Sequence, residues 1–68
     1  MKKRSCASLK KGEKVAFRFI KDKAFGYGIV VSVGYDKVTV NMNKEIEVAF
    51  EDMVGVLDFN GEYSEIGG

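Results

Sequence analysis

Residues 26–59 read GYGIVVSVGYDKVTVNMNKEIEVAFEDMVGVLDF, and this stretch decides the fold. Apolar residues recur at short range in runs at 27–33, 37–42 and 45–50, and a further run follows at 54–59. Alternation with a period of two is typical of strands that bury one face. Gly34 and Asn43 stand between runs, where turns favour residues that accept positive φ. The stretch therefore predicts four strands joined by short turns.

One more strand is predicted ahead of this stretch, at Lys14–Ile20, where Val15, Phe17 and Phe19 alternate with their neighbours. Residues 21–26 are interpreted as the loop that follows it, and residues 51–53 fit one helical turn before the last strand. We expect an all-β fold: a small five-stranded SH3-like barrel, closed by the first strand lying beside the last. The alternative is an open five-stranded sheet that protects its edges by dimerising.

The flanking segments carry opposite charge. Residues 1–23 hold nine of the eleven Lys and Arg residues against two acids, and residues 44–68 hold seven acids against one lysine. The two segments thus carry +7 and −6, whereas the whole chain carries only +1. We interpret residues 1–11 as a flexible basic arm, 12–59 as the barrel and 60–68 as an acidic, Gly-ended tail.

The composition excludes several kinds of site. A chain of 68 residues makes one small domain with a thin core. Cys6 is its only cysteine and it has no histidine, so an internal disulfide and an ordinary Cys/His zinc site are excluded. Without histidine and without paired carboxylates in an apolar pocket, we expect no enzyme and no cofactor. The lone thiol and the lack of an apolar leader favour the cytoplasm, away from membranes.

Several short runs resemble SH3-like barrels of the KOW and Tudor kind. They are GEKV at 12–15, GIVVSV at 28–33, DKVTV at 36–40 and VAFEDM at 48–53, so the resemblance covers roughly residues 12–58. It implies a binding module for RNA, DNA, protein tails or ribosomal partners, by analogy at the level of the fold. The chain lacks tryptophan and the aromatic-rich strand ends that the cage of a methyl-lysine reader requires.

A basic surface edged by aromatic rings is the first candidate site. Cations give salt-dependent affinity for phosphates, and exposed rings offer stacking platforms for unpaired bases. We therefore expect RNA or DNA as partner, against the simpler interpretation of a solvated basic face with aromatics in the core. The candidate residues are Lys10, Lys11, Lys14, Arg18, Lys21, Lys23, Phe25, Tyr27 and Tyr35.

The acidic half provides the alternative, a protein-interaction module or small inhibitor acting through Glu45, Glu47, Glu51 and Asp52. Self-association of basic and acidic surfaces is a further alternative, and so is internal pairing of strand-one cations with acids such as Asp58.

Two other features are interpreted as structural. The Gly26-Tyr27-Gly28 run is assigned to a bulge or a close backbone approach, because no phosphate-loop motif follows it. Cys6 is expected to be an exposed, inert thiol in the arm, because no base lies near it in the sequence.

Overall fold

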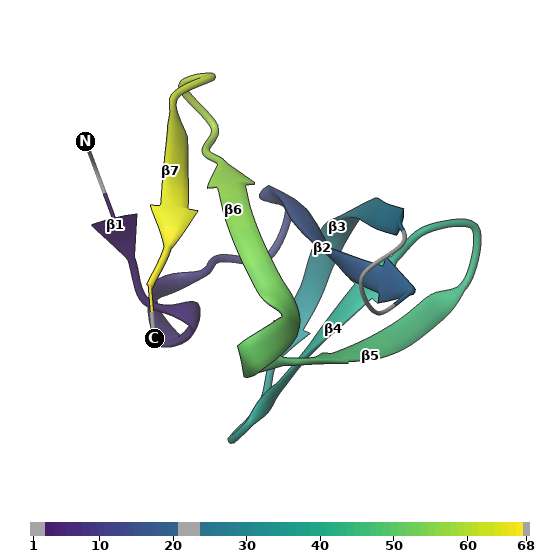
Figure 1. Cartoon of the computed structure of the whole chain (residues 1–68). Helices are drawn as coiled ribbons and strands as arrows, with labels where there is room; N and C mark the ends of the chain where they lie inside the picture. Colours follow the sequence, from purple (N-terminus) through teal and green to yellow (C-terminus); the bar gives the residue numbers. More distant parts are fainter. Residues whose placement is uncertain (1–2, 21–23, 68) are drawn as a thin grey trace.

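The computed structural model describes residues 3–20 and 24–67, without the side chain of residue 20. Its strands form one twisted, curved sheet in the order β1-β7-β6-β2-β3-β4-β5 (Figure 1). All neighbours pair antiparallel except β1 and β7, which pair parallel. The elements are β1 (Lys3–Arg4), the 3-10 turn η1 (Cys6–Ser8), β2 (Lys14–Ile20), β3 (Ala24–Val33), β4 (Lys37–Asn41), β5 (Glu45–Ala49), the 3-10 turn η2 (Phe50–Asp52), β6 (Met53–Leu57) and β7 (Tyr63–Ile66).

The all-β class is confirmed, but the closed five-stranded barrel is wrong. The described chain forms seven strands, and the sheet leaves β1 at one edge and β5 at the other. The predicted contact between the first and last barrel strands does exist, because β2 pairs with β6. The two extra strands, β1 and β7, extend the sheet beyond β6 and leave it open.

The strand limits shift where side-chain packing outweighs the local pattern. β2 spans the predicted residues, and η2 lies one residue earlier than the predicted helical turn. Ala24 to Gly26 were assigned to a loop, but they continue β3. A Cβ on Gly26 would come within 2.8 Å of the Phe17 ring, so glycine lets this ring pack against the β3 backbone. This close approach is the structural role of Gly26, which pairs in regular register with Phe17; the bulges lie elsewhere.

The two flanking segments belong to the folded unit. Lys3 and Arg4, assigned to the flexible arm, form β1, and residues of the predicted tail form β7. Cys6 was expected to be exposed, and this is wrong: only 7% of it is accessible, and its Sγ lies 3.7 Å from the carbonyl oxygen of Phe50. Burial raises the pKa of this thiol, which keeps it protonated.

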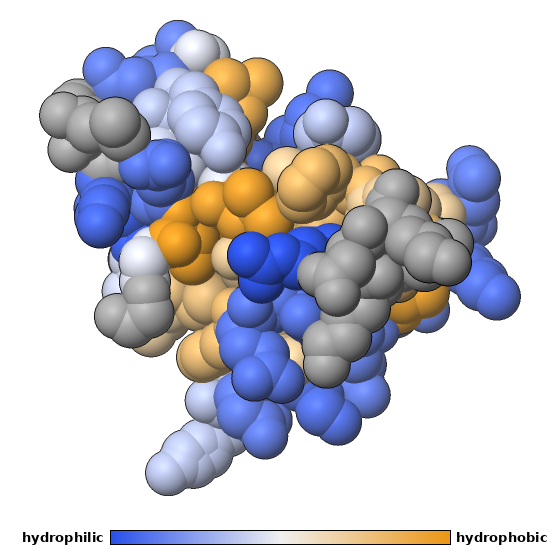
Figure 2. All heavy atoms as spheres, viewed as in Figure 1, coloured by the Kyte–Doolittle hydropathy of each residue, from blue (hydrophilic) through white to orange (hydrophobic). Residues whose placement is uncertain are grey.

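The core lies against the concave face of the sheet and is built mainly from valines. The best-buried large side chains are Phe17, Val15, Val30, Val38, Val40 and Val56. Val15 pairs with Val56, and Val30 with Val40, so the apolar alternation of neighbouring strands is in phase. Figure 2 shows further apolar side chains gathered over β6 and beside the end of β7, with hydrophilic residues around them. Within the described ranges, no helix is long and apolar enough to span a membrane.

Candidate functional site

The side of the sheet opposite the core presents an unusual number of exposed apolar side chains on four adjacent strands, β7, β6, β2 and β3. We call it the outer face. Its residues are Tyr63 and Glu65 of β7, Gly55 and Leu57 of β6, Lys14, Ala16 and Arg18 of β2, and Phe25, Tyr27 and Ile29 of β3.

The strand register arranges this outer face in rows. Lys14 stands directly between Ile29 of β3 and Leu57 of β6, and Tyr63 follows Leu57 in the same row. Directly opposed side chains on neighbouring strands have Cβ atoms about 5 Å apart. The exposed Lys14 side chain therefore starts between two apolar side chains, Ile29 and Leu57.

In each of the next two rows, a residue of β2 stands opposite an aromatic ring of β3. Ala16 pairs with Tyr27, and Arg18 pairs with Phe25. The rings are accessible, since 65% of Tyr27 and 63% of Phe25 is exposed. The side chain of Ala16 is small, so the sheet surface beside the Tyr27 ring is not covered by a large side chain. A planar group therefore has room to lie against the Tyr27 ring.

The two cations of the outer face are not neutralised within the described chain. Lys14 and Arg18 form no ion pair with a carboxylate of residues 3–20 or 24–67. Within the described residues, the Arg18 guanidinium donates to the backbone carbonyl oxygen of Glu51, at 3.3 Å. The predicted pairing with Asp58 does not occur, because its Oδ1 accepts the N–H groups of Asn60 and Glu62.

The structure thus brings together four of the nine predicted nucleic-acid residues: Lys14, Arg18, Phe25 and Tyr27. Lys10 and Lys11 lie exposed in the segment before β2. Tyr35 is 92% exposed, but it lies in the turn between β3 and β4, beyond the opposite end of β3 from Phe25. Lys21 and Lys23 lie outside the described residues.

Sequence reasoning missed three apolar members of the outer face. Ile29 lies in the predicted strand at 27–33, where Ile29, Val30 and Val31 are all apolar, so the pattern did not show which of them faces solvent. Leu57 and Tyr63 gave no such signal, because their position depends on β6 pairing with β7. Tyr63 lies across Gly55, where any Cβ would overlap its phenol oxygen. Gly55 therefore allows the tyrosine ring to lie against the sheet.

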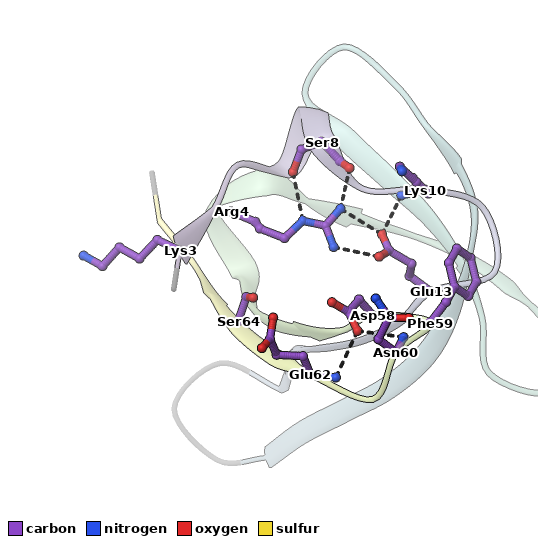
Figure 3. A pocket seen from close by; sticks show the side chains of 10 residues that line it. All are labelled: Lys3, Arg4, Ser8, Lys10, Glu13, Asp58, Phe59, Asn60, Glu62 and Ser64. Carbon is purple, nitrogen blue, oxygen red and sulfur yellow. Dashed lines mark hydrogen bonds and ion pairs between the residues drawn. The ribbon is translucent and has the colours of Figure 1, made fainter. Parts of the chain in front are cut away.

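A second group of polar residues, which we call the clasp, joins β1 to the segment before β2 (Figure 3). Nη1 and Nη2 of Arg4 donate to the two carboxylate oxygens of Glu13, at 2.6 and 2.9 Å. Arg4 also donates to the Oγ and the carbonyl oxygen of Ser8. The backbone N–H of Lys10 donates to Glu13 at 2.8 Å. Glu13 is only 2% exposed, and these contacts compensate its burial.

The opposite charges of Arg4 and Glu13 stabilise each other in the clasp. The hydrogen bonds from Arg4 lower the pKa of the Glu13 carboxyl, and burial opposes them less strongly. The same contact with Glu13 raises the pKa of Arg4. Figure 3 shows the pair on one side of a hollow, with the turn that carries Asp58 and Asn60 on the other. The Arg4 guanidinium thus makes four hydrogen bonds within the protein, so its charge is compensated by Glu13.

The acidic residues of the alternative site are divided between two elements. Glu45 and Glu47 lie exposed on the edge strand β5, whereas Glu51 and Asp52 lie in η2. Glu47 and Asp52 line one shallow hollow together with Phe19 and Ile46.

No group of three or more Cys, Asp or Glu side chains within the described ranges has the arrangement of a metal site. Comparison of the chain with protein-family models, with curated proteins and with solved structures finds no match. Function is therefore inferred from the surfaces of this molecule alone.

Proposed function

We propose that the protein is a non-enzymatic module that binds nucleic acid, free or within a ribonucleoprotein, through its outer face. Unpaired bases stack on Tyr27 and Phe25, and the Lys14 and Arg18 side chains lie against the phosphates between them. Base stacking on an exposed ring contributes about 1–3 kcal/mol for each base and tolerates any sequence.

One observation supports this proposal above the others: the register places the Phe25 ring opposite Arg18, and the Tyr27 ring opposite Ala16, which lies between Lys14 and Arg18 on the same strand. A solvated basic face does not require exposed rings. Five large apolar side chains on a chain of 68 residues are costly to leave in water unless a partner covers them. The resemblance to KOW and Tudor domains agrees with a binding role and adds analogy only.

A mobility-shift titration with single-stranded RNA, single-stranded DNA and duplex DNA tests the proposal. Measured at about 50 and 200 mM salt, we expect micromolar binding to single strands that weakens steeply as salt rises. Duplex DNA should bind more weakly, because its bases are stacked on one another and are not available to the rings.

A charge-matched pair of variants then locates the surface. Lys14→Glu with Arg18→Glu reverses the two outer-face cations, and Lys37→Glu with Lys44→Glu reverses two exposed lysines near the opposite edge of the sheet. Both double variants change the net charge equally. Only the first should abolish binding; for the neutral pair Lys14→Gln with Arg18→Gln, the salt slope should fall by about 1–2. Equal weakening by both reversals, or no binding by the native protein at low salt, would overturn the proposal.

A further inference from the structure

The free edge of β5 has the backbone geometry to accept another strand. The amide of Phe50 donates to the carbonyl of Asp36, and the amide of Met42 donates to that of Lys44. In an antiparallel ladder, hydrogen-bonded pairs alternate with pairs that are not bonded. The bonded pairs therefore include Val38–Val48 and Val40–Ile46, and the backbone groups of Glu45 and Glu47 point away from β4.

No strand covers these backbone groups within the described part of the chain. The sheet order ends at β5, so the N–H and C=O groups of Glu45 and Glu47 form the open edge. Such an edge is a template for β-strand addition, in which main-chain hydrogen bonds supply affinity and alternate side chains supply specificity.

A hollow of about 270 Å³ lies beside this edge, between β5 and the end of β2. Its lining includes the apolar residues Phe19, Ile46 and Val48, the acids Glu47 and Asp52, and Arg18 at the β2 side. Phe19 is 53% exposed, and its ring packs edge-on against Phe17 with the centroids 6.4 Å apart. The hollow thus leaves an apolar side chain uncovered next to unpaired backbone groups.

The side chains of β5 indicate which strand fits. Glu45 and Glu47 project to the exposed side, whereas Ile46 is half-buried and Val48 is buried on the other side. A strand paired with β5 places every second side chain opposite a glutamate and the side chains between them toward the hollow. Two copies of β5 paired antiparallel would instead bring Glu47 close to a glutamate of the other copy, which opposes self-association through this edge.

We propose that the β5 edge binds an extended peptide segment whose residues alternate between Lys or Arg and apolar side chains. The segment adds antiparallel to β5, its cations face Glu45 and Glu47, and its apolar side chains cover Phe19. This site shares Arg18 with the outer face but none of the outer-face rings, and it does not depend on nucleic-acid binding.

The test uses a fluorescein-labelled octapeptide that alternates Lys and Val, followed by fluorescence anisotropy. A block peptide with the same four lysines and four valines, grouped rather than alternating, is the control for charge. We expect the alternating peptide to bind at least tenfold more tightly. In the ¹⁵N-labelled protein, it should slow hydrogen exchange at the amides of Glu45 and Glu47. Equal affinity for both peptides, no binding of either, or protection only on the outer face would overturn the proposal.

Two variants at one position separate backbone from charge. Glu47→Ala removes the carboxylate and keeps the edge N–H, whereas Glu47→Pro also removes that N–H without removing a bond to β4. We expect about a threefold loss of affinity for the first and tenfold or more for the second. Equal losses contradict strand addition. If the proline variant fails to fold, the native protein is tested with a peptide that is N-methylated at its edge-facing amides, which should lose binding by the same reasoning.

Discussion

Arg4 of the clasp and Arg18 of the outer face come from the same basic segment but have opposite environments. The Arg4 guanidinium is held by both oxygens of Glu13 and by Ser8, whereas among the described residues the Arg18 guanidinium donates only to a backbone carbonyl. Part of the positive charge of the N-terminal segment is therefore compensated by Glu13, in the contact that holds β1 in place. Only the cations that remain on the surface, Lys14 and Arg18 among them, are available to a partner.

Removing the carboxylate of the clasp gives the largest expected effect. In Glu13→Ala, the Arg4 guanidinium and the Lys10 amide lose their partner in a largely buried place. We expect the free energy of unfolding to fall by about 3 kcal/mol, measured by urea denaturation. Glu65→Ala, at an exposed acid, is the control and should change it by less than about 0.5 kcal/mol. A similar loss in both variants would contradict a specific role for the clasp.

Removing one ring of the outer face should change binding without changing stability. Tyr27→Ala is expected to weaken binding to single-stranded nucleic acid by tenfold or more, because one stacking platform is lost. Tyr35→Ala removes an even more accessible ring from the turn at the other end of β3. Affinity measured by fluorescence anisotropy should be unaffected in this control, and an equal loss in both would show that the rings act without regard to position.

Acid should weaken the clasp, because the Glu13 carboxylate takes up a proton. The folded protein lowers the pKa of Glu13 below its ordinary value of 4.5, so the unfolded chain takes up a proton first as the pH falls. This contribution to stability is fully present well above pH 4.5 and is lost as the pH drops through the lowered folded value. Urea denaturation between pH 6 and 2 should show a decline that is shallower in Glu13→Gln. Parallel declines in the two proteins would contradict this.

The smallest expected effect concerns Gly55, against which the Tyr63 ring of the outer face lies. Gly55→Ala places a methyl group where the Tyr63 hydroxyl lies, so the ring must turn away from the sheet. We expect a loss of affinity for single strands of about twofold to fivefold, because this ring is displaced rather than removed. Tyr63→Ala should give an equal or larger loss, and combining the two changes should add nothing, since both act on the same ring. Additive losses would indicate separate effects.

The central strands are predictable from the sequence because their side chains follow a local rule. Val15, Val38 and Val48 each follow a charged residue and precede a threonine or an alanine, and all three point into the core. β7 violates this rule, since its Ser64 is buried and its Tyr63 is exposed, so no pattern indicates a strand there. Its formation depends on pairing with β6 and β1, which only the folded chain supplies.

In the candidate site and the clasp, too, some features follow from the local sequence and others depend on pairing between distant segments. Lys14 and Arg18 are four residues apart on one strand, so their common face follows from the sequence. The pairing of Arg18 with Phe25 does not, because residues 21–26 were predicted to form a loop. The burial of Glu13 does not follow from any local signal. A carboxylate at this position is ordinarily solvated, and only Arg4, brought in by the β1–β7 pairing, makes burial favourable.

The pairing of Lys3 with Glu65 has a consequence for the order of folding. β2 to β5 contact partners close in sequence, whereas β1 must close a loop of almost the entire chain, which carries a large entropic cost. During synthesis on the ribosome, β1 has no partner until residues 63–66 have emerged. The hairpins from β2 to β5 can therefore form first, and the two ends of the described chain join last.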